Sequence, residues 1–276
     1  MASHTSPDFG VISAVRYDPS LVSPAIVDEA QFAACKASLD PTPFFLFPRH
    51  IARLNASYKY FWPEEAAAAV AKDGTVISAE ALLAALYSAV KDPKKVWRIR
   101  PFVYRDRTIK VESNEVGPRA DLFSGLKADT KPEDADSWTI YIDTEATPQS
   151  SITMFKTSNR DPYTAARERV LPPNYPVSGT TVEVLVYNEQ QQITEGSLTN
   201  VAFWRGGEWV TPSSNEIGGL RGAVKAELLE RGLIREMKSD EAVGVESVKE
   251  GEKVLLMNGV QGCTCGYVRL GGYRED

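Results

Sequence analysis

The sequence contains few of the residues that build metal centres and nucleophilic triads. There are two histidines, His4 and His50, and three cysteines among 276 residues. A multi-histidine metal site is therefore not available, and a Ser-His-Asp or Cys-His catalytic set would depend on His50 alone. An odd, sparse set of cysteines argues against a disulfide framework and for a reducing compartment. We expect no metal, and chemistry that uses lysine, an acid, tyrosine, a hydroxyl or a borrowed cofactor.

The sequence also lacks a basic segment and a long apolar run. The formal net charge is −6, and no block of lysine and arginine stands out. We therefore expect no nucleic-acid partner. No apolar run approaches the ~20 residues of a membrane span, and the start of the chain is polar, without an apolar signal core. The interpretation is a cytoplasmic globular protein that binds a small molecule and no membrane.

Helical patterns dominate the first half of the sequence and strand patterns the second, which predicts an α+β fold. A linker-like stretch at 146–151 suggests a small N-terminal α/β domain at 1–146 and a C-terminal domain at 147–276. Residues 114–137 are polar and predict a loop. Helices are expected at 47–60, 63–74, 78–92, 222–232 and after residue 161. Strands are expected at 8–17, 95–104, 107–112, 138–143, 152–156, 253–258 and 264–270, with hairpins at 181–196 and 201–212.

Two features favour phosphate binding. The segment GGLRG, residues 218–222, comes before a predicted helix, where exposed N–H groups attract phosphate and glycines allow close approach of the backbone. Arg53 lies on a predicted helix with His50, and arginine makes forked hydrogen bonds to phosphate. Each has a plainer alternative, because short glycine clusters often form ordinary turns and most arginines are solvated.

Two further residues suggest covalent and acid–base chemistry. Lys156 ends a predicted apolar strand near the expected domain boundary, where a lysine can form a Schiff base. Glu195 lies in the strand-rich stretch TEGSLTNVAFW, and a carboxylate buried there needs a cationic or hydrogen-bonding partner. The alternatives are a solvent-facing lysine and a glutamate on the surface of a hairpin.

Taken together, the four features are the parts of a pyridoxal phosphate site. Lys156 would form the imine, while Arg53 and the helix start at 218–222 would bind the phosphate. The protonated pyridine nitrogen would be the missing partner of Glu195, and a cationic ring is the electron sink of this cofactor. Lys156, released from the imine, can act as the general base.

Six stretches carry a resemblance to a known family. They are RHIARLNAS (49–57), RIRP (98–101), FKTSNRDPYTAARER (155–169), EVLVYNEQQQITEGSLTNVAFWRGGEWVTP (183–212), GGLRGAVKAELLERG (218–232) and VLLMNGVQG (254–262). In wording and order the sequence resembles the class IV aminotransferase family, which comprises fold type IV pyridoxal phosphate enzymes. Within the family it looks closest to the fungal aminodeoxychorismate lyase-like branch.

The resemblance implies roles for individual residues. Lys156 would form the imine and shuttle the proton, and Glu195 would pair with the pyridine nitrogen. The phosphate would be bound by Arg53, the backbone N–H groups of Leu220 and Arg221, and a cup closed by Asn258 and Gly259. Arg100 would lie on the substrate side and meet a carboxylate. The family often has threonine at the position of Arg221 and serine or threonine at that of Gly259, which bears on cofactor affinity.

The resemblance also implies a fold and a function. The fold would be a two-domain fold type IV, D-amino acid/branched-chain aminotransferase-like, with the cofactor between the domains and a homodimer as the usual assembly. The leading hypothesis is a 4-amino-4-deoxychorismate lyase giving 4-aminobenzoate and pyruvate for folate synthesis. The alternatives are a transaminase on a branched-chain or D-amino acid or an amine, which would use the same residues, and a non-catalytic protein that keeps the fold.

The lyase reaction raises two further questions about side chains. It needs a small acid near the leaving group, for which Ser13 and Thr42 are both candidates. The loop at 114–137 could supply a substrate arginine such as Arg119, although a solvated loop charge is the simpler interpretation.

Overall fold

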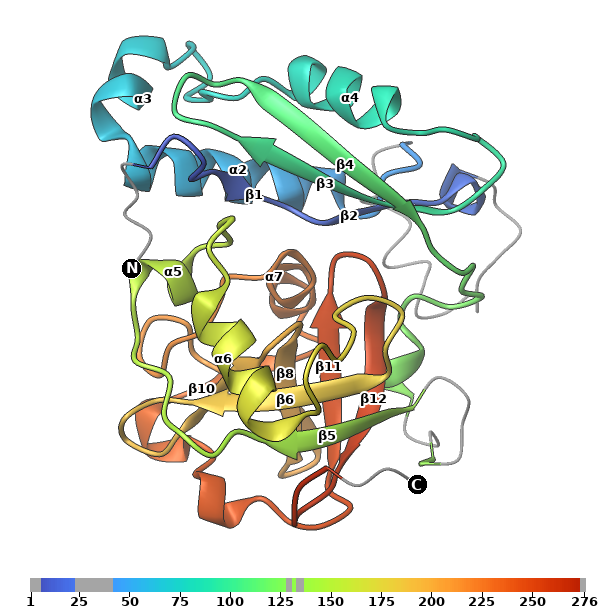
Figure 1. The fold of residues 1–276 in the computed structure, drawn as a ribbon, viewed down its shortest axis with the longest axis vertical. Helices are drawn as coiled ribbons and strands as arrows, with labels where there is room; N and C mark the ends of the chain where they lie inside the picture. The colour runs from blue at the N-terminus through green and yellow to red at the C-terminus, as the bar shows by residue number, and fades with distance from the viewer. Residues whose placement is uncertain (1–5, 23–41, 128–130, 133–136, 274–276) are drawn as a thin grey trace. The chain divides into compact units, whose positions relative to one another are not determined.

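The computed structural model describes residues 6–22, 42–127, 131–132 and 137–273, and Figure 1 shows their arrangement in each part of the chain. Contacts divide the chain into two compact units. Unit 1 contains Met1–Asp121 together with Phe155–Asn159, and unit 2 contains Leu122–Met154 together with Arg160–Asp276. Residues 128–130 and 133–136 of the predicted 114–137 loop lie outside the described residues, as does His4.

Unit 1 is a four-stranded antiparallel sheet with helices. Strand β3 is central, because β1 and β2 pair with it along one edge and β4 pairs with it along the other. Its side chains alternate between buried and half-buried positions, as the sequence pattern predicts. The described elements are β1 (Val11–Ile12), β2 (Val15–Tyr17), η1 (Pro19–Val22), α2 (Phe47–Phe61), α3 (Pro63–Ala69), α4 (Ala79–Ser88), β3 (Trp97–Val103) and β4 (Ile109–Glu115).

The helices of unit 1 begin within one residue of the predicted starts, and α3 and α4 end earlier than predicted. Pro48 lies in the first turn of α2, and the Ser78 side chain caps α4 by accepting a 3.1 Å hydrogen bond from the N–H of Ala81. Helix α3 ends at Ala69, because Val70 is already extended, and α4 ends at Ser88. The predicted helices at 63–74 and 78–92 are therefore several residues too long.

Unit 2 is built on an eight-stranded mixed sheet with the order β10-β9-β8-β11-β12-β5-β6-β7. Every residue of β6 is buried. The hydrophobic core of unit 2 includes Leu185 of β6 together with Phe203 and Leu256. The elements are η2 (Ser124–Leu126), β5 (Trp138–Ile142), α5 (Ser151–Met154), α6 (Asp161–Val170), β6 (Val182–Tyr187), β7 (Ile193–Gly196), β8 (Asn200–Arg205), β9 (Glu208–Pro212), α7 (Ala223–Glu230), β10 (Arg235–Met237), η3 (Ser239–Glu241), η4 (Val245–Ser247), β11 (Lys253–Asn258) and β12 (Gly262–Val268).

Both predicted hairpins are present in unit 2. Strand β6 pairs antiparallel with β7, and β8 pairs antiparallel with β9. The second hairpin turns at Gly206 and Gly207, which both have positive φ and so suit a tight hairpin turn. Gly232 follows the C-cap residue of α7 and has a φ of 65°. It therefore terminates the helix in the left-handed conformation that glycine readily adopts at this position.

The segment around Lys156 differs from the prediction. Residues 152–156 were expected to form a strand, but α5 covers Ser151–Met154 as a short helix. Its turn is closed locally, because the Thr153 hydroxyl donates to the Ser150 carbonyl at 3.0 Å and accepts from the Ser150 N–H at 3.0 Å. Local hydrogen bonds of this kind compete with strand pairing for a Ser/Thr-rich segment.

The predicted boundary between residues 146 and 147 falls inside unit 2. Strand β5 comes before this boundary in the sequence and lies between β12 and β6 in the sheet of unit 2. Its Trp138 and Ile140 belong to the hydrophobic core of that unit. Lys156 in turn belongs to unit 1. Its carbonyl accepts a 2.9 Å hydrogen bond from the N–H of Ile12, which holds the segment against β1.

Two classes of feature are absent from the described residues. No helix among them combines the length and the apolar composition that crossing a membrane requires. No group of three or more His, Cys, Asp and Glu residues in this part of the chain could hold a metal ion.

Gly262 tests the packing of unit 2. A Cβ added there would lie 2.0 Å from the Leu122 carbonyl oxygen at φ 72°, whereas one at Gly232 would meet nothing within 4 Å at φ 65°. We expect Gly232→Ala to cost about 1–2 kcal/mol, the price of the left-handed backbone alone. Gly262→Ala should cost clearly more, as measured by the urea dependence of unfolding. Equal losses in the two variants would contradict the predicted overlap.

Candidate functional site

Unit 1 brings together four side chains from three distant segments: Ser13, His50, Arg53 and Lys156. Ser13 follows β1 directly, and His50 and Arg53 lie one turn apart on α2. Lys156 joins them through the main-chain hydrogen bond to Ile12. Its charge also reaches His50, since it is one of the groups that lower the pKa of that imidazole.

A chain of hydrogen bonds connects the first three of these side chains. The Ser13 hydroxyl lies 2.8 Å from Nδ1 of His50, and Nη2 of Arg53 donates to Ser13 Oγ at 2.5 Å. His50 is fully buried, and this burial lowers its pKa well below 6.5, with further lowering from the charges of Arg53 and Lys156. The imidazole is therefore neutral at neutral pH, and its Nδ1 can accept the hydrogen of Ser13.

Arg53 is a cation in a poorly solvated position. Burial lowers its pKa to about 10, so it stays charged at neutral pH. Its Nε is buried and has no hydrogen-bond partner among the residues that the structure describes. A buried donor on a cation that lacks an acceptor suits an anionic ligand. Arg53 thus has the free donor that its predicted phosphate role requires, and the role itself stays a prediction.

The N–H of Ser13 donates to the Pro101 carbonyl of β3 at 3.1 Å. The predicted substrate arginine, Arg100, precedes Pro101 in this strand. Its Nη1 is 3.8 Å from Glu112 Oε2, and its side chain is 26% exposed. Arg119 is half-buried, and its charge helps to lower the pKa of Arg16, after burial as the main cause. Arg119 is therefore more than a solvated loop charge.

Glu195 lies in β7 of unit 2 and is 3% exposed. The phenol of Tyr163, on α6, donates a 2.7 Å hydrogen bond to Glu195 Oε1. Burial raises the pKa of Tyr163 well above 10, and the Glu195 charge raises it further, so this phenol keeps its proton. The buried-carboxylate interpretation of Glu195 is thus supported by the structure, and Tyr163 is a partner that the sequence did not indicate.

A second buried carboxylate organises the turn that follows Glu195. Glu183, on β6, accepts hydrogen bonds from the hydroxyls of Ser197 and Thr199 at 2.6 and 2.7 Å. It also accepts from the backbone N–H groups of Val184 and Leu198. Burial raises the pKa of Glu183, and these hydrogen bonds oppose the shift. The hydroxyls of Ser197 and Thr199, which follow Glu195 in the sequence, therefore stabilise the Glu183 carboxylate. A glutamate inside the apolar strand VEVLVY was the signal that could have revealed it.

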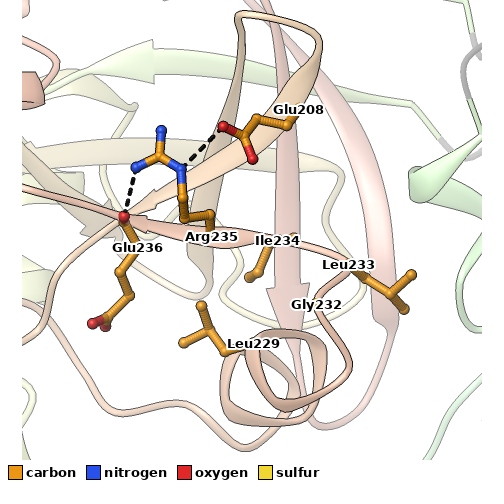
Figure 2. Close-up of a pocket in the computed structure, with 7 residues that line it drawn as sticks. All are labelled: Glu208, Leu229, Gly232, Leu233, Ile234, Arg235 and Glu236. Atoms are coloured by element: carbon orange, nitrogen blue, oxygen red, sulfur yellow. Dashed lines mark hydrogen bonds and ion pairs between the residues drawn. The ribbon is translucent and has the colours of Figure 1, made fainter.

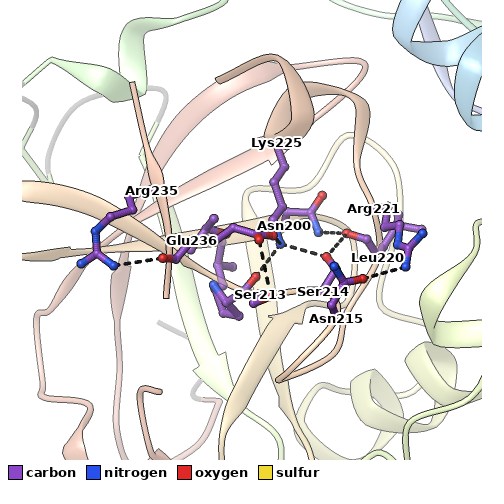
Figure 3. A network of polar contacts seen from close by, with 12 residues as sticks. Asn200, Ser213, Ser214, Asn215, Leu220, Arg221, Lys225, Arg235 and Glu236 are labelled. Carbon is purple, nitrogen blue, oxygen red and sulfur yellow. Dashed lines mark hydrogen bonds and ion pairs between the residues drawn. The ribbon is translucent and has the colours of Figure 1, made fainter. Parts of the chain in front are cut away.

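The glycine-rich loop before α7 lies beside Glu195. A Cβ on Gly219 would lie 2.9 Å from the Thr194 carbonyl oxygen and 3.6 Å from Glu195 Cβ. Asn200 fixes the position of the loop, because its Nδ2 donates to the Leu220 carbonyl at 2.8 Å (Figure 3). A side chain at Gly222 would overlap Asn200. Glycine at positions 219 and 222 therefore leaves room for these protein contacts, and the predicted approach of a phosphate to the helix start stays a prediction.

Two cations flank this loop (Figure 3). Lys225, on α7, is 4% exposed and donates to the Pro212 carbonyl at 2.5 Å and to Ser214 Oγ at 2.9 Å. Burial lowers the pKa of Lys225, while Glu236 and then Glu195 raise it. The Arg221 side chain is exposed and donates to Asn215 Oδ1 at 2.7 Å. The Arg221 guanidinium is therefore bound to Asn215, and the predicted phosphate contact of the Arg221 backbone N–H stays a prediction.

Met257 pairs with Asn200, the first residue of β8, so β11 ends where β8 begins. The last residue of β11 is Asn258. Its Oδ1 accepts hydrogen bonds from the N–H groups of Val260 and Gln261 at 2.9 and 2.8 Å. The side chain thus shapes the turn that contains Gly259. Asn258 and the Asn200 anchor of the glycine loop consequently lie at the same end of the sheet.

A pocket of about 440 Å³ lies in unit 2 (Figure 2). Oε1 of Glu236, one of its lining residues, is 3.6 Å from Nζ of Lys225. Arg235 lines it and is already paired, since its Nε donates to Glu208 at 3.0 Å and its Nη1 to Glu241 at 2.8 Å. None of the predicted site residues lines this pocket, which is formed by Glu208, Leu229, Gly232, Leu233, Ile234, Arg235 and Glu236. We therefore do not assign it to the site.

Comparison with known proteins agrees with this geometry. The profile of the amino-transferase class IV family matches residues 34–265. A Schizosaccharomyces pombe protein, provisionally named as an aminodeoxychorismate lyase, is 30% identical over 217 residues, which are 78% of this chain and 80% of that protein. Aminodeoxychorismate lyase of Saccharomyces cerevisiae is 35% identical over 145 residues, covering 48% of this chain and 37% of that protein.

A solved structure shows the same fold. Branched-chain amino acid aminotransferase from Escherichia coli matches with a TM-score of 0.58 and 16% identity, over 96% of this chain and 79% of that chain. At this identity the match concerns the fold, and it confirms the predicted α+β, fold type IV architecture.

The buried His50 predicts a pH dependence of stability in the protein without cofactor. Its pKa is lowered below 6.5 in the folded state, so below that pH the unfolded chain binds a proton that the folded chain does not. The free energy of unfolding should fall as the pH drops from about 7 to 5, with a slope of up to about 1.4 kcal/mol per pH unit from His50. In His50→Gln this part of the slope should be missing, as measured by urea unfolding at each pH. Identical slopes in the two proteins would refute a neutral, buried His50.

Proposed function

This chain belongs to the class IV aminotransferase family, whose members are pyridoxal phosphate enzymes, and we propose that it is a 4-amino-4-deoxychorismate lyase. The reaction would release pyruvate and give 4-aminobenzoate for folate synthesis. The observation that carries the choice of reaction is the match to a fungal relative with that name over about four fifths of both chains. The predicted transaminase reaction would use the same residues, and no contact among the described residues of either unit favours it.

The described residues fit the cofactor. Arg53, with its unpartnered buried Nε, would bind the phosphate together with the backbone N–H groups of Leu220 and Arg221. The turn at Asn258 and Gly259 would complete the phosphate cup. Glu195 would pair with the ring nitrogen, since it is a buried carboxylate already oriented by Tyr163. When bound, pyridoxal phosphate supplies the covalent attachment point for an amine and the electron sink for a carbanion.

The remaining chemistry is assigned to side chains of this protein. The amine of Lys156 would remove the proton from the ring carbon that carries the substrate's amino group, as a general base. The C–O bond to the enolpyruvyl group then breaks, the ring becomes aromatic, and a proton delivered to the methylene carbon completes pyruvate. Arg100 would bind a substrate carboxylate, because a half-buried guanidinium suits that anion.

The two candidate acids differ in their contacts. The Ser13 hydroxyl is engaged by both His50 and Arg53, which suits a role in orienting Arg53. The Thr42 hydroxyl makes a longer, 3.5 Å contact with the Phe44 carbonyl. Thr42 is therefore the candidate that we retain for the acid.

We further propose a cytoplasmic homodimer, the assembly that the resemblance implies. Light scattering of the purified protein would measure the mass in solution, and a monomer that retains full activity would contradict the proposal.

The lyase is tested by supplying the purified protein and pyridoxal phosphate with enzymatically generated aminodeoxychorismate. We expect equimolar 4-aminobenzoate and pyruvate, with no product from Lys156→Ala and unchanged rates from Lys72→Ala, an exposed lysine. Borohydride reduction followed by mass spectrometry should place the cofactor on the peptide that contains Lys156. A protein that carries the cofactor there but forms neither product would exclude the lyase. Conversion of its cofactor to the amine form by amino donors would then identify a transaminase.

The role of Ser13 is tested by measuring cofactor affinity and turnover separately. Ser13→Ala removes the acceptor of the Arg53 hydrogen bond, so the Kd for pyridoxal phosphate should rise about tenfold, as for loss of one charge-assisted bond. The kcat at saturating cofactor should stay within about twofold, because general-acid loss would cost about a hundredfold or more. Thr42→Ala should show the reverse pattern. A large fall of kcat in Ser13→Ala, with unchanged Kd, would instead make Ser13 the acid.

A further inference from the structure

We propose that Tyr163 is a positioning residue that fixes the Glu195 carboxylate. By doing so it keeps the proton that lies between this carboxylate and the nitrogen of the cofactor ring on the nitrogen. This inference rests on the proposed use of pyridoxal phosphate and on the contacts of Tyr163 within unit 2. It assigns a role to a residue that neither the motif comparison nor the family match singles out.

The first support is the geometry of the contact. Tyr163 is the third residue of α6, and its phenol donates to Glu195 Oε1 at 2.7 Å. Tyr163 is 7% exposed and Glu195 is 3% exposed. A hydrogen bond to a carboxylate is strong when water is excluded from both partners. The second neighbour of the phenol oxygen is the Thr153 carbonyl at 3.4 Å, so the shorter contact takes the proton.

The second support is that the ring of Tyr163 is itself held in place. The Arg160 guanidinium lies over the ring, 5.0 Å from its centroid. The same side chain donates from Nη2 to the Ser197 carbonyl at 2.6 Å, in the turn that follows Glu195. Tyr163 also packs with Ala166 and Val186 in a small buried cluster. Arg160 therefore covers the Tyr163 ring and links the start of α6 to the turn that follows Glu195.

The third support is the protonation state of the phenol. Burial and the neighbouring Glu195 charge raise the pKa of Tyr163 well above 10, although Arg160 opposes the shift. Tyr163 is consequently a donor at every working pH. A donated hydrogen bond stabilises the negative charge on Glu195, so a proton placed between this carboxylate and a pyridine nitrogen stays on the nitrogen. The protonated ring is the form that accepts electrons best.

The test compares the full-length holoenzyme with Tyr163→Phe, which removes the hydroxyl and keeps the ring. With cofactor labelled by ¹⁵N in the ring, we expect the nitrogen resonance to move from the protonated toward the unprotonated position in the variant. The kcat for the lyase reaction should fall by roughly tenfold to a hundredfold, with KM within about twofold. Tyr17→Phe is the matched control, because Tyr17 is also buried and its phenol donates to the Pro93 carbonyl. It should change neither quantity.

A double variant separates positioning from a general loss of structure. If Tyr163 acts through Glu195, its removal should have no further effect on the nitrogen resonance or on kcat in a Glu195→Gln background. Additive losses, or an unchanged resonance in Tyr163→Phe with cofactor bound, would overturn this inference and leave the proposed function intact. A wild-type protein that binds no pyridoxal phosphate would overturn the proposed function and this inference together.

Discussion

The buried carboxylate of Glu183 is the constraint on which the candidate site of unit 2 depends. It lies in a strand whose every residue is buried, where an unsatisfied charge would cost several kcal/mol. Hydroxyls and N–H groups of the turn after Glu195 satisfy it, and Arg167 adds a favourable charge. The turn can therefore take one shape without leaving this charge unpaired. That shape determines where Glu195 and Asn200, on either side of it, are placed.

From this turn the order extends to the loop before α7. Asn200 binds the Leu220 carbonyl, so the backbone of the loop is held by a residue that Glu183 positions indirectly. Lys225 ties the other side of the loop to Pro212 and Ser214. The N–H groups proposed to bind phosphate are thus oriented before any ligand arrives. Donors fixed in advance bind an anion without having to reorganise, which is the usual condition for an efficient cofactor site.

The candidate site residues of unit 1 depend on a different interaction, the buried cation of Arg53. Arg53 keeps its charge, yet its Nε has no partner among the described residues. The neutral His50 supports Arg53 through Ser13 without adding a competing positive charge. Lys156 lies in the same unit because its carbonyl binds the N–H of Ile12. A strand-edge contact, rather than the neighbouring sequence, therefore decides to which unit the proposed catalytic lysine belongs.

The sequence by itself determined the α+β class, the start of α2, both hairpins and the identity of the residues proposed for the cofactor. These follow from local signals, namely periodicity, turn glycines and motif wording, which need no knowledge of distant segments. Tertiary structure alone decided the helical form of 151–154, the early ends of α3 and α4, and the membership of β5 and Lys156. It also decided the partners of the buried groups, including Tyr163 for Glu195 and the turn hydroxyls for Glu183. The reason is physical: a buried polar group is satisfied by whichever donor the fold brings within hydrogen-bond distance, and sequence spacing does not contain that distance.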